Sequence, residues 1–206
     1  MRRPRPYLPR IDSPAHQQLL DFVGRYVPVD PELAAAVAAA WRPWSVARDE
    51  PVLPQGRTCR HVYFLAEGLM RYHYRDDEGR DVTKFFTEPP YCFTSLRSFN
   101  GGVPAPEAIT AVVDSAGLVL AQADSDRLLR RPPWATFVRL LVAEVQDYTE
   151  DILLESTRVG PAERYAALLR DRPALVGQLP QKHLASYLGI APQSLSRIRR
   201  RLAHGS

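Results

Sequence analysis

The sequence predicts an α+β fold in which an antiparallel β-roll of the jelly-roll type, with flanking helices, is followed by one long helix and a C-terminal helix-turn-helix. Three observations predict this fold. Short β candidates separated by glycine-containing turns fill residues 46–121. From residue 134 the apolar residues repeat at a helical spacing, and residues 181–203 hold two amphipathic segments joined at a glycine. We therefore divide the chain into residues 1–131, 132–157 and 158–206.

The composition suits a folded protein with one large domain or two small ones. Of its 206 residues, 45% are hydrophobic, which is enough for a substantial core. No apolar run reaches the roughly 18 residues that a membrane span needs, and the basic start MRRPRPYLPR lacks the apolar region of a secretory signal. Cys59 and Cys92 are expected as two reduced thiols in a β core, with a redox pair as the open alternative. We expect a cytoplasmic protein with no membrane partner.

Two helices are expected before the strands. Ser13 is a typical N-cap and Pro14 suits a first helical turn, so a short helix begins there. Its apolar positions are Leu19, Leu20, Phe22 and Val23. A second helix, rich in alanine, is expected near Asp30 to Trp41.

The next region is expected to form the β-roll. Gly56, Gly68 and the Asp77-Glu78-Gly79 cluster are typical of the turns between short strands. Many short strands separated by such turns indicate an antiparallel barrel or jelly roll. The expected strands are Val46 to Leu53, His61 to Leu65, Leu69 to Tyr74, Val82 to Phe86, Ala108 to Val113 and Gly117 to Ala121.

A long helix is expected from Pro132 and Pro133 to about Thr157. Six apolar residues along it step by four and three in alternation, which is the seam of a coiled coil. The alternative is a helix packed on its own barrel, but the 3.5-residue repeat favours a partner helix. We therefore predict a homodimer. The predicted dimer interface is Trp134, Val138, Leu141, Val145, Tyr148 and Ile152.

The segment QKHLASYLGIAPQSLSRIRRRLA, residues 181–203, has the pattern of a helix-turn-helix. Gly189 stands where the first helix ends, because glycine tolerates left-handed backbone there, and Pro192 suits the first turn of the second helix. The residues expected to face the core are Leu184, Ala185, Leu188, Leu195, Ile198 and Leu202.

The opposite face of this motif is polar and basic. Residues 158–206 hold nine Arg or Lys and two Asp or Glu, a net charge of +7, whereas the whole chain has +4. Such a face suits the major groove of double-stranded DNA, and the alternative is an αα-hairpin with a solvated basic face. The predicted DNA-binding residues are Lys182, Gln193, Ser194, Arg197, Arg200 and Arg201.

A β-roll, a long helix, a short hinge and a helix-turn-helix, in this order, resemble the Crp/Fnr superfamily of bacterial transcription regulators over nearly the whole chain. The stretch LPQGRTCRHVYFLAEGLMRYHYRDDEGRDVTKFF is similar to the glycine-punctuated hairpins of its cyclic-nucleotide-binding fold. The stretch ERYAALLRDRPALVGQLPQKHLASYLGIAPQSLSRIRRRL is similar to its DNA-binding end. The resemblance implies a regulator that binds a pseudo-palindromic operator as a homodimer, with Gln193, Ser194 and Arg197 at base edges. It also implies RNA polymerase as a partner.

The resemblance breaks down at the effector pocket. Members that bind cyclic AMP have a Gly-Glu pair, whose Glu holds the ribose, and later an Arg-Ser or Arg-Thr pair, whose Arg neutralises the cyclic phosphate. Here Phe93–Thr94 and Ala105–Pro106 stand at about those places, and Arg97 lies between them. A phosphate desolvated without a positioned cation has no compensation, so we expect no cyclic nucleotide bound in the usual way. Phe93, Thr94 and Arg97 form the candidate pocket for an unidentified small-molecule effector, if the protein has one.

Other chemistries fit the sequence less well. An iron–sulfur cluster needs about four cysteines, and His73 is a lone strand histidine rather than a typical haem ligand. A cupin metal site needs closely spaced histidines, whereas His61 and His73 are twelve residues apart. We expect no enzyme activity, metal or cofactor. The open alternative is a ligand-binding β-roll protein, or a cupin-like metalloenzyme, whose helix-turn-helix does not read DNA.

The DNA-binding end also departs from the superfamily. Larger relatives form part of a wing from further strands after the recognition helix. Here the residues expected as wing material are Val176 to Leu179, ahead of the first helix of the motif. The domain is therefore expected to depend on its recognition helix and on dimerisation.

Overall fold

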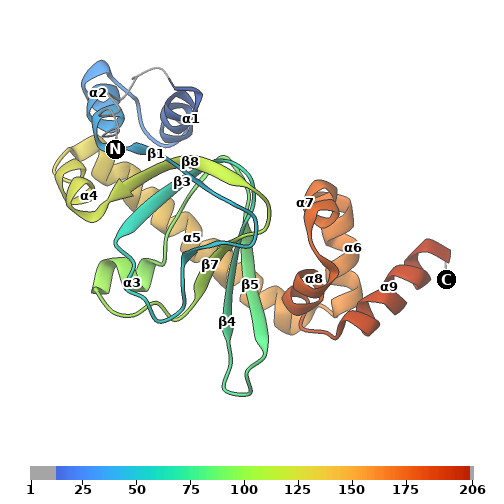
Figure 1. The fold of residues 1–206 in the computed structure, drawn as a ribbon. Coiled ribbons are helices and arrows are strands. Elements are labelled where there is room, and N and C mark those ends of the chain that lie inside the picture. The colour runs from blue at the N-terminus through green and yellow to red at the C-terminus, as the bar shows by residue number, and fades with distance from the viewer. Residues whose placement is uncertain (1–12, 205–206) are drawn as a thin grey trace, which may run out of the picture.

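A computed structural model describes residues 13–204 of the chain. A β-roll lies at the centre, two helices cover one end of it, a long helix runs along it, and a small helical domain lies at the other end (Figure 1). The architecture is the predicted α+β fold.

The roll consists of two four-stranded sheets with antiparallel pairing. One sheet has the order β1-β8-β3-β6 and the other the order β2-β7-β4-β5, so β5 is the last strand of its sheet. Apolar side chains between the sheets, such as Leu65, Met70 and Ile109, form the roll interior. The strands are β1 Arg42–Val46, β2 Pro51–Leu53, β3 His61–Glu67, β4 Met70–Arg75, β5 Asp81–Thr87, β6 Tyr91–Phe93, β7 Ala108–Ala111 and β8 Ser115–Ala121.

Several elements of the roll differ from the prediction. The expected strand from Val46 to Leu53 is two strands, β1 and β2, because the chain turns between them at Asp49, whose φ is +64°. Strand β6 and the short helices α3 (Leu96–Gly101) and α4 (Gln122–Leu128) were not predicted. Each spans three to seven residues, which is too short to show a periodic pattern.

The two N-terminal helices begin as their sequence predicts. Helix α1 (Pro14–Val23) starts at Ser13, whose hydroxyl accepts a hydrogen bond from the His16 backbone N–H. Helix α2 (Pro31–Ala40) is capped by Asp30 in the same way. Both helices pack on the outer side of the roll, where Phe22 and Trp41 are fully buried.

The long helix α5 (Pro132–Arg158) runs where the prolines and the apolar repeat place it. Its first turns belong to the core of the same chain. Trp134 is only 2% exposed and contacts Trp41 and Phe137, whose ring centroids lie 6.4 and 4.9 Å away. Leu141 packs against the same cluster. The predicted interface is therefore wrong at Trp134, because the N-terminal helices and the roll cover this end of the helix.

The described part of the C-terminal domain, up to residue 204, contains four helices: α6 (Pro161–Asp171), α7 (Pro173–Gln178), α8 (Gln181–Tyr187) and α9 (Pro192–His204). Val176, expected in wing material, lies in α7 and is buried in the domain core, since Pro173 begins a helical turn there. The expectation of wing material in this place is wrong for Val176.

The helices of the structure can be compared with a membrane span in length and apolar character. Within residues 13–204, no helix combines the length and the apolar character that crossing a bilayer requires.

Candidate nucleic-acid interface and the β-roll interior

The turn between α8 and α9 has the geometry that the sequence predicts. Gly189 has a φ of +71°. Its N–H donates to the Ser186 carbonyl, and the Ile190 N–H donates to the Ala185 carbonyl, which is the Schellman pattern at a helix end. Pro192 then begins α9. The turn therefore positions α9 through backbone geometry that a residue other than glycine would strain.

The two helices pack through a small apolar core. Leu184, Ala185 and Leu195 are fully buried, and Leu188 and Ile198 are nearly so. The Gln181 side-chain amide adds hydrogen bonds to the Pro192 carbonyl and the Ser196 hydroxyl, at 2.9 and 2.6 Å. The two helices are therefore held together across the turn by polar as well as apolar contacts.

The buried face of α9 is shorter than predicted. Leu202, expected in the core, is 47% exposed. The domain core covers Leu195 and Ile198 but does not extend to the last turn of α9.

The outward face of the motif is exposed and basic. Gln193, Arg197, Arg200 and Arg201 are exposed on α9, as is Lys182 on α8, whereas Ser194 is half-buried. Neither helix contains an aspartate or a glutamate. The structure thus exposes five of the six predicted DNA-binding residues and leaves Ser194 half-buried.

Arg199 has a different environment from its neighbours. Its guanidinium lies over the Tyr165 ring, 5.6 Å from the centroid, and Nε donates to the Tyr165 hydroxyl at 3.1 Å. Arg199 therefore ties α9 to α6 and does not belong to the outward face.

The residues of the candidate effector pocket are not together. Phe93 is buried in the roll interior, stacked on Tyr63 with ring centroids 5.0 Å apart. The Thr94 hydroxyl donates to the His61 carbonyl at 2.8 Å. Arg97 lies on α3 and is exposed. The pocket prediction is therefore wrong for Arg97, because α3 turns this side chain toward solvent.

A carboxylate that the sequence analysis missed lies in the same region. Glu107 is only 6% exposed, and its carboxylate accepts hydrogen bonds from the Ser95 hydroxyl at 2.6 Å and the Lys84 ammonium at 2.9 Å. It directly follows Ala105–Pro106, where the superfamily has its phosphate-binding pair. The sequence already indicates an unusual residue here, since Glu107 is a lone acid among small and apolar residues.

The two cysteines lie in separate parts of the core. Cys59 is in the roll interior, where its thiol donates to the His61 carbonyl at 3.3 Å, and Cys92 lies in the cluster beneath α1 and α2. Burial raises the pKa of the Cys92 thiol well above its usual range. The Cys92 thiol is therefore held protonated, the less reactive form.

The histidines of the roll do not form a ligand pair. His61 is exposed on β3, whereas His73 is on β4 in the other sheet, where it contacts the Asp81 carboxylate and the Thr110 hydroxyl at 3.0 and 2.9 Å. Within residues 13–204, no three His, Cys, Asp or Glu side chains come together as a group that could hold a metal ion.

Comparison with known proteins gives matches among solved structures. No protein-family model matches the chain, and no curated protein matches it in sequence. FixK2 from Bradyrhizobium japonicum shares 20% sequence identity, with a TM-score of 0.64 over 80% of this chain and 85% of that one. A regulator described as a member of the Crp/Fnr family, from Eubacterium rectale, shares 15% identity, with a TM-score of 0.69 over 88% and 89%.

A third structure has the same architecture at lower identity. CLP from Xanthomonas campestris, described as a c-di-GMP-responsive global regulator, shares 10% identity, with a TM-score of 0.68 over 85% of this chain and 92% of that one. The fold thus matches over 80–88% of this chain and 85–92% of the three structures. The chain has the fold of the Crp/Fnr superfamily of transcription regulators, as its sequence predicts.

Proposed function

We propose that the protein is a transcription regulator of the Crp/Fnr type that binds double-stranded DNA through α9. The two-sided character of this helix is the observation that best supports the proposal. Leu195 and Ile198 are buried on one side, and Arg197 and Arg201 are exposed on the other. An acid-free helix with an apolar back and exposed arginines fits the major groove, since arginine binds both guanine and phosphate.

The proposal divides the chain by role: residues 1–131 as the effector or sensor part, residues 132–157 as the dimerisation helix and residues 158–206 as the DNA-binding domain. RNA polymerase is a further proposed partner, and the proposal includes no enzymatic activity. The similar structures support a regulator of this kind through shared fold, and the specific role rests on the surface of α9.

A homodimer through α5 is part of the proposal, with a seam shifted from the predicted one. Trp134, Phe137 and Leu141 pack against the N-terminal helices and the roll. The Glu144 carboxylate accepts hydrogen bonds from the Tyr26 hydroxyl, between α1 and α2, and from the Tyr91 hydroxyl on β6. These positions of α5 form one stripe of the helix. The adjacent stripe, which steps by four and three, is Val138, Val142, Val145, Thr149 and Ile152, and of these Val138 also packs against the core cluster of its own chain.

A partner helix is proposed to cover the shifted seam from Val142 onward. Val142, Val145 and Ile152 are half-exposed and belong to none of the core clusters within residues 13–204. Val145 and Ile152 were in the predicted interface and stay in the proposed one. Tyr148 leaves it, since it lies beside Arg172 of the C-terminal domain.

The roll is proposed not to bind cyclic nucleotides in the usual way. The buried Glu107 carboxylate lies next to the place where a phosphate would need a cation, and Lys84 is already paired with it. A second anion there would face like charge in a poorly solvated site. Calorimetric titration with cyclic AMP and cyclic GMP should therefore give no binding at micromolar concentration.

The test of DNA binding is selection from a random duplex pool with the full chain. The expected product is a pseudo-palindrome whose half-sites are centred about one helical turn, roughly 34 Å, apart. Arg197→Ala combined with Arg201→Ala is the matched negative variant, since both residues are exposed and outside the core. Equal enrichment by the wild type and this variant, or no enrichment by the wild type, would contradict the proposed function.

A further inference from the structure

The C-terminal domain is docked onto the roll, and the docking follows strand β5. Helix α8 lies next to β5, at the right-hand end of the roll in Figure 1. Because β5 is the last strand of its sheet, the backbone groups on its outer side have no neighbouring strand to bond with.

Ser186 of α8 satisfies two of these backbone groups at once. Its Oγ accepts a hydrogen bond from the Thr83 N–H at 2.9 Å and donates one to the Asp81 carbonyl at 2.8 Å. One hydroxyl of the helix-turn-helix thus occupies the place that a further strand would take along the edge of the sheet.

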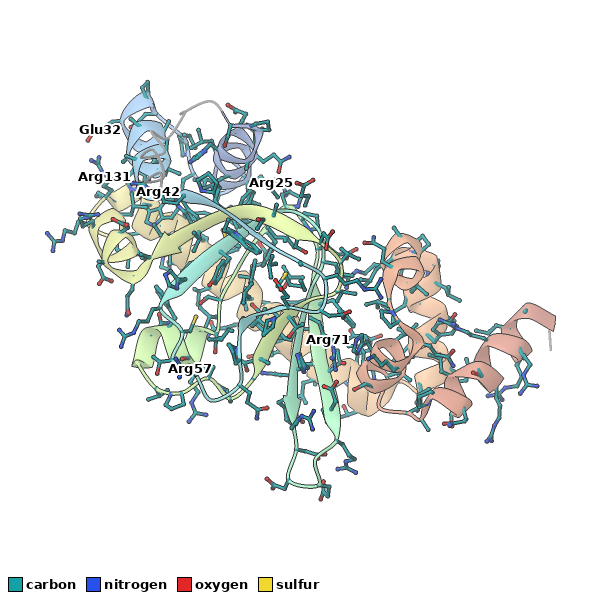
Figure 2. All side chains as sticks on the ribbon, in the orientation of Figure 1. Arg25, Glu32, Arg42, Arg57, Arg71 and Arg131 are labelled. Carbon is teal, nitrogen blue, oxygen red and sulfur yellow. The ribbon has the colours of Figure 1, made fainter. Side chains whose placement is uncertain are left out.

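The part of β5 that Ser186 binds is itself held in place. Arg71, only 4% exposed, donates from Nε to the Thr83 hydroxyl at 2.9 Å and from Nη2 to the Asp81 carboxylate at 2.6 Å. Figure 2 shows Arg71 on the side of the roll that faces the helical domain. The two residues that bind Ser186 are therefore fixed from the roll side.

Two more contacts lie further along the same strand. The Tyr187 ring packs on Phe86 with centroids 5.6 Å apart. Beyond the end of β5, the Arg172 guanidinium donates twice to the Glu88 carboxylate, with its Nε at 2.8 Å. Because these contacts are spread from Asp81 to Glu88, they restrict both rotation and translation of the C-terminal domain relative to the roll.

The chain segment that connects α5 to α6 would not by itself restrict the orientation of the C-terminal domain. Helix α5 ends at Arg158, and α6 starts after Gly160, where a Cβ would meet nothing within 4 Å. The backbone at Val159 and Gly160 is extended, so the joint is a short open hinge. Docking on β5, rather than the hinge, defines the direction in which α9 points.

We propose that Ser186 is a positioning residue that determines which operator half-site spacing the dimer accepts. This inference rests on the proposed function. Trp134 and Phe137 of α5 share one core cluster with the N-terminal helices and with strands β3 and β8 of the roll, and α8 is fixed to α9 through the motif core. Leu69, Phe86 and Val112 of the roll share one apolar cluster with the C-terminal domain, which holds the two parts together without a preferred direction. The directional Ser186 hydrogen bonds fix the register of α8 along β5, so they set the distance and the angle between the two recognition helices of a dimer.

The experiment measures the affinity for duplexes that carry the two selected half-sites. The spacer between the half-sites is shortened or lengthened by one to four base pairs. Each added base pair rotates one half-site about the DNA axis as well as moving it. For the wild type we expect affinity to fall at least about tenfold for a change of two base pairs, because a docked domain cannot follow the rotation. For Ser186→Ala combined with Arg172→Met the loss should be under about threefold, with unchanged affinity for a single half-site.

Three further measurements separate positioning from folding. Ser186→Thr retains the hydroxyl and should restore the narrow spacing preference, and Ser45→Ala, an exposed serine on β1, should behave like the wild type. Hydrogen exchange reads the contact without DNA: the Thr83 amide should exchange at least about tenfold faster in Ser186→Ala than in the wild type.

These measurements distinguish a failure of the proposed function from a failure of the proposed role of Ser186. A wild-type protein that binds no duplex would overturn the proposed function, and the role of Ser186 in spacing with it. A wild-type protein with a narrow preference that the Ser186→Ala, Arg172→Met variant shares would overturn the role of Ser186 alone. An unchanged exchange rate at Thr83 would overturn the docking contact itself.

Discussion

Among single residues, Arg197 and Arg201 are expected to affect DNA binding in different ways. Both are exposed on α9, but Arg197 lies in the first half of the helix, where base edges are within reach, and Arg201 lies near its end. The first is expected to donate to a guanine and the second to a phosphate.

Arg197→Ala should therefore lower discrimination at one symmetric base pair by about 1–3 kcal/mol. Arg201→Ala should weaken matched and mismatched duplexes alike and flatten the salt dependence. Fluorescence titration with both duplex types at two salt concentrations measures this, with the exposed roll residue Arg57 changed to Ala as the control. A uniform loss of affinity in Arg197→Ala would show that Arg197 meets the backbone instead.

Glu107 is expected to matter for stability rather than for catalysis. Its replacement by Ala leaves the buried Ser95 hydroxyl and the Lys84 ammonium without their acceptor. The free energy of unfolding should fall by about 1–3 kcal/mol, with the lower part of the range favoured because Lys84 is partly solvated.

Urea unfolding of the Glu107→Ala protein measures the change. Glu78→Ala is the matched control, since Glu78 is exposed in the β4–β5 turn and pairs there with Arg80. Equal stability of both variants and the wild type would show that Glu107 contributes no net stabilisation.

At the scale of elements, the docking of α8 on the roll predicts a dependence on pH. Burial, with the positive charges of Arg71 and Lys182, lowers the pKa of His183 to about 4, and Asp81 and His73 are the other titrating groups that act on it. The pKa in the unfolded chain is near 6.5, so protonation favours unfolding. This contribution to stability is complete above about pH 6.5 and is lost progressively as the pH falls toward 4.

Thermal unfolding between pH 7 and pH 4 measures this effect. His183→Gln should make the melting temperature less dependent on pH across that range, while His61→Gln, on the exposed start of β3, should leave the dependence unchanged. If both variants follow the wild-type curve, His183 is not the group that titrates.

The long helix shows why an apolar repeat alone does not identify a partner. Burial and the Glu144 carboxylate raise the pKa values of Tyr26 and Tyr91, which keeps both phenols protonated as donors to α5. One side of α5 is therefore fixed to the roll of the same chain, and the 4-3 spacing of apolar residues serves both this contact and the proposed seam.

At the scale of the whole molecule, the proposed dimer gives a direct test of the shifted seam. Val142→Asp combined with Val145→Asp would bury unpaired charge between two α5 helices, which is strongly unfavourable, so light scattering should report a monomer. Ala143→Asp, at an exposed position of the same helix, is the control and should remain a dimer. A dimer that persists in the double variant would place the interface on another surface.

Much of the architecture is determined by local sequence. Ser13 and Asp30 as caps, Pro132 at the start of α5 and Gly189 in the turn define element boundaries through backbone chemistry that acts within a few residues. The basic face of α9 follows from helical spacing alone, because side chains on a known helix have known directions.

Other features depend on contacts between residues far apart in the chain, and the tertiary structure alone decided them. The roll, not a second copy, covers Trp134, and α3 turns Arg97 to solvent while Glu107 takes the buried place. Ser186 meets β5 across 103 residues of sequence. The sequence by itself determined where the longer helices begin and which face of α9 is polar, because these follow from periodicity and capping, whereas the short elements β6, α3, α4 and α7 did not follow from it. Only the tertiary structure decided which face of α5 is covered and in which direction α9 points, because both depend on contacts between residues that are far apart in the sequence.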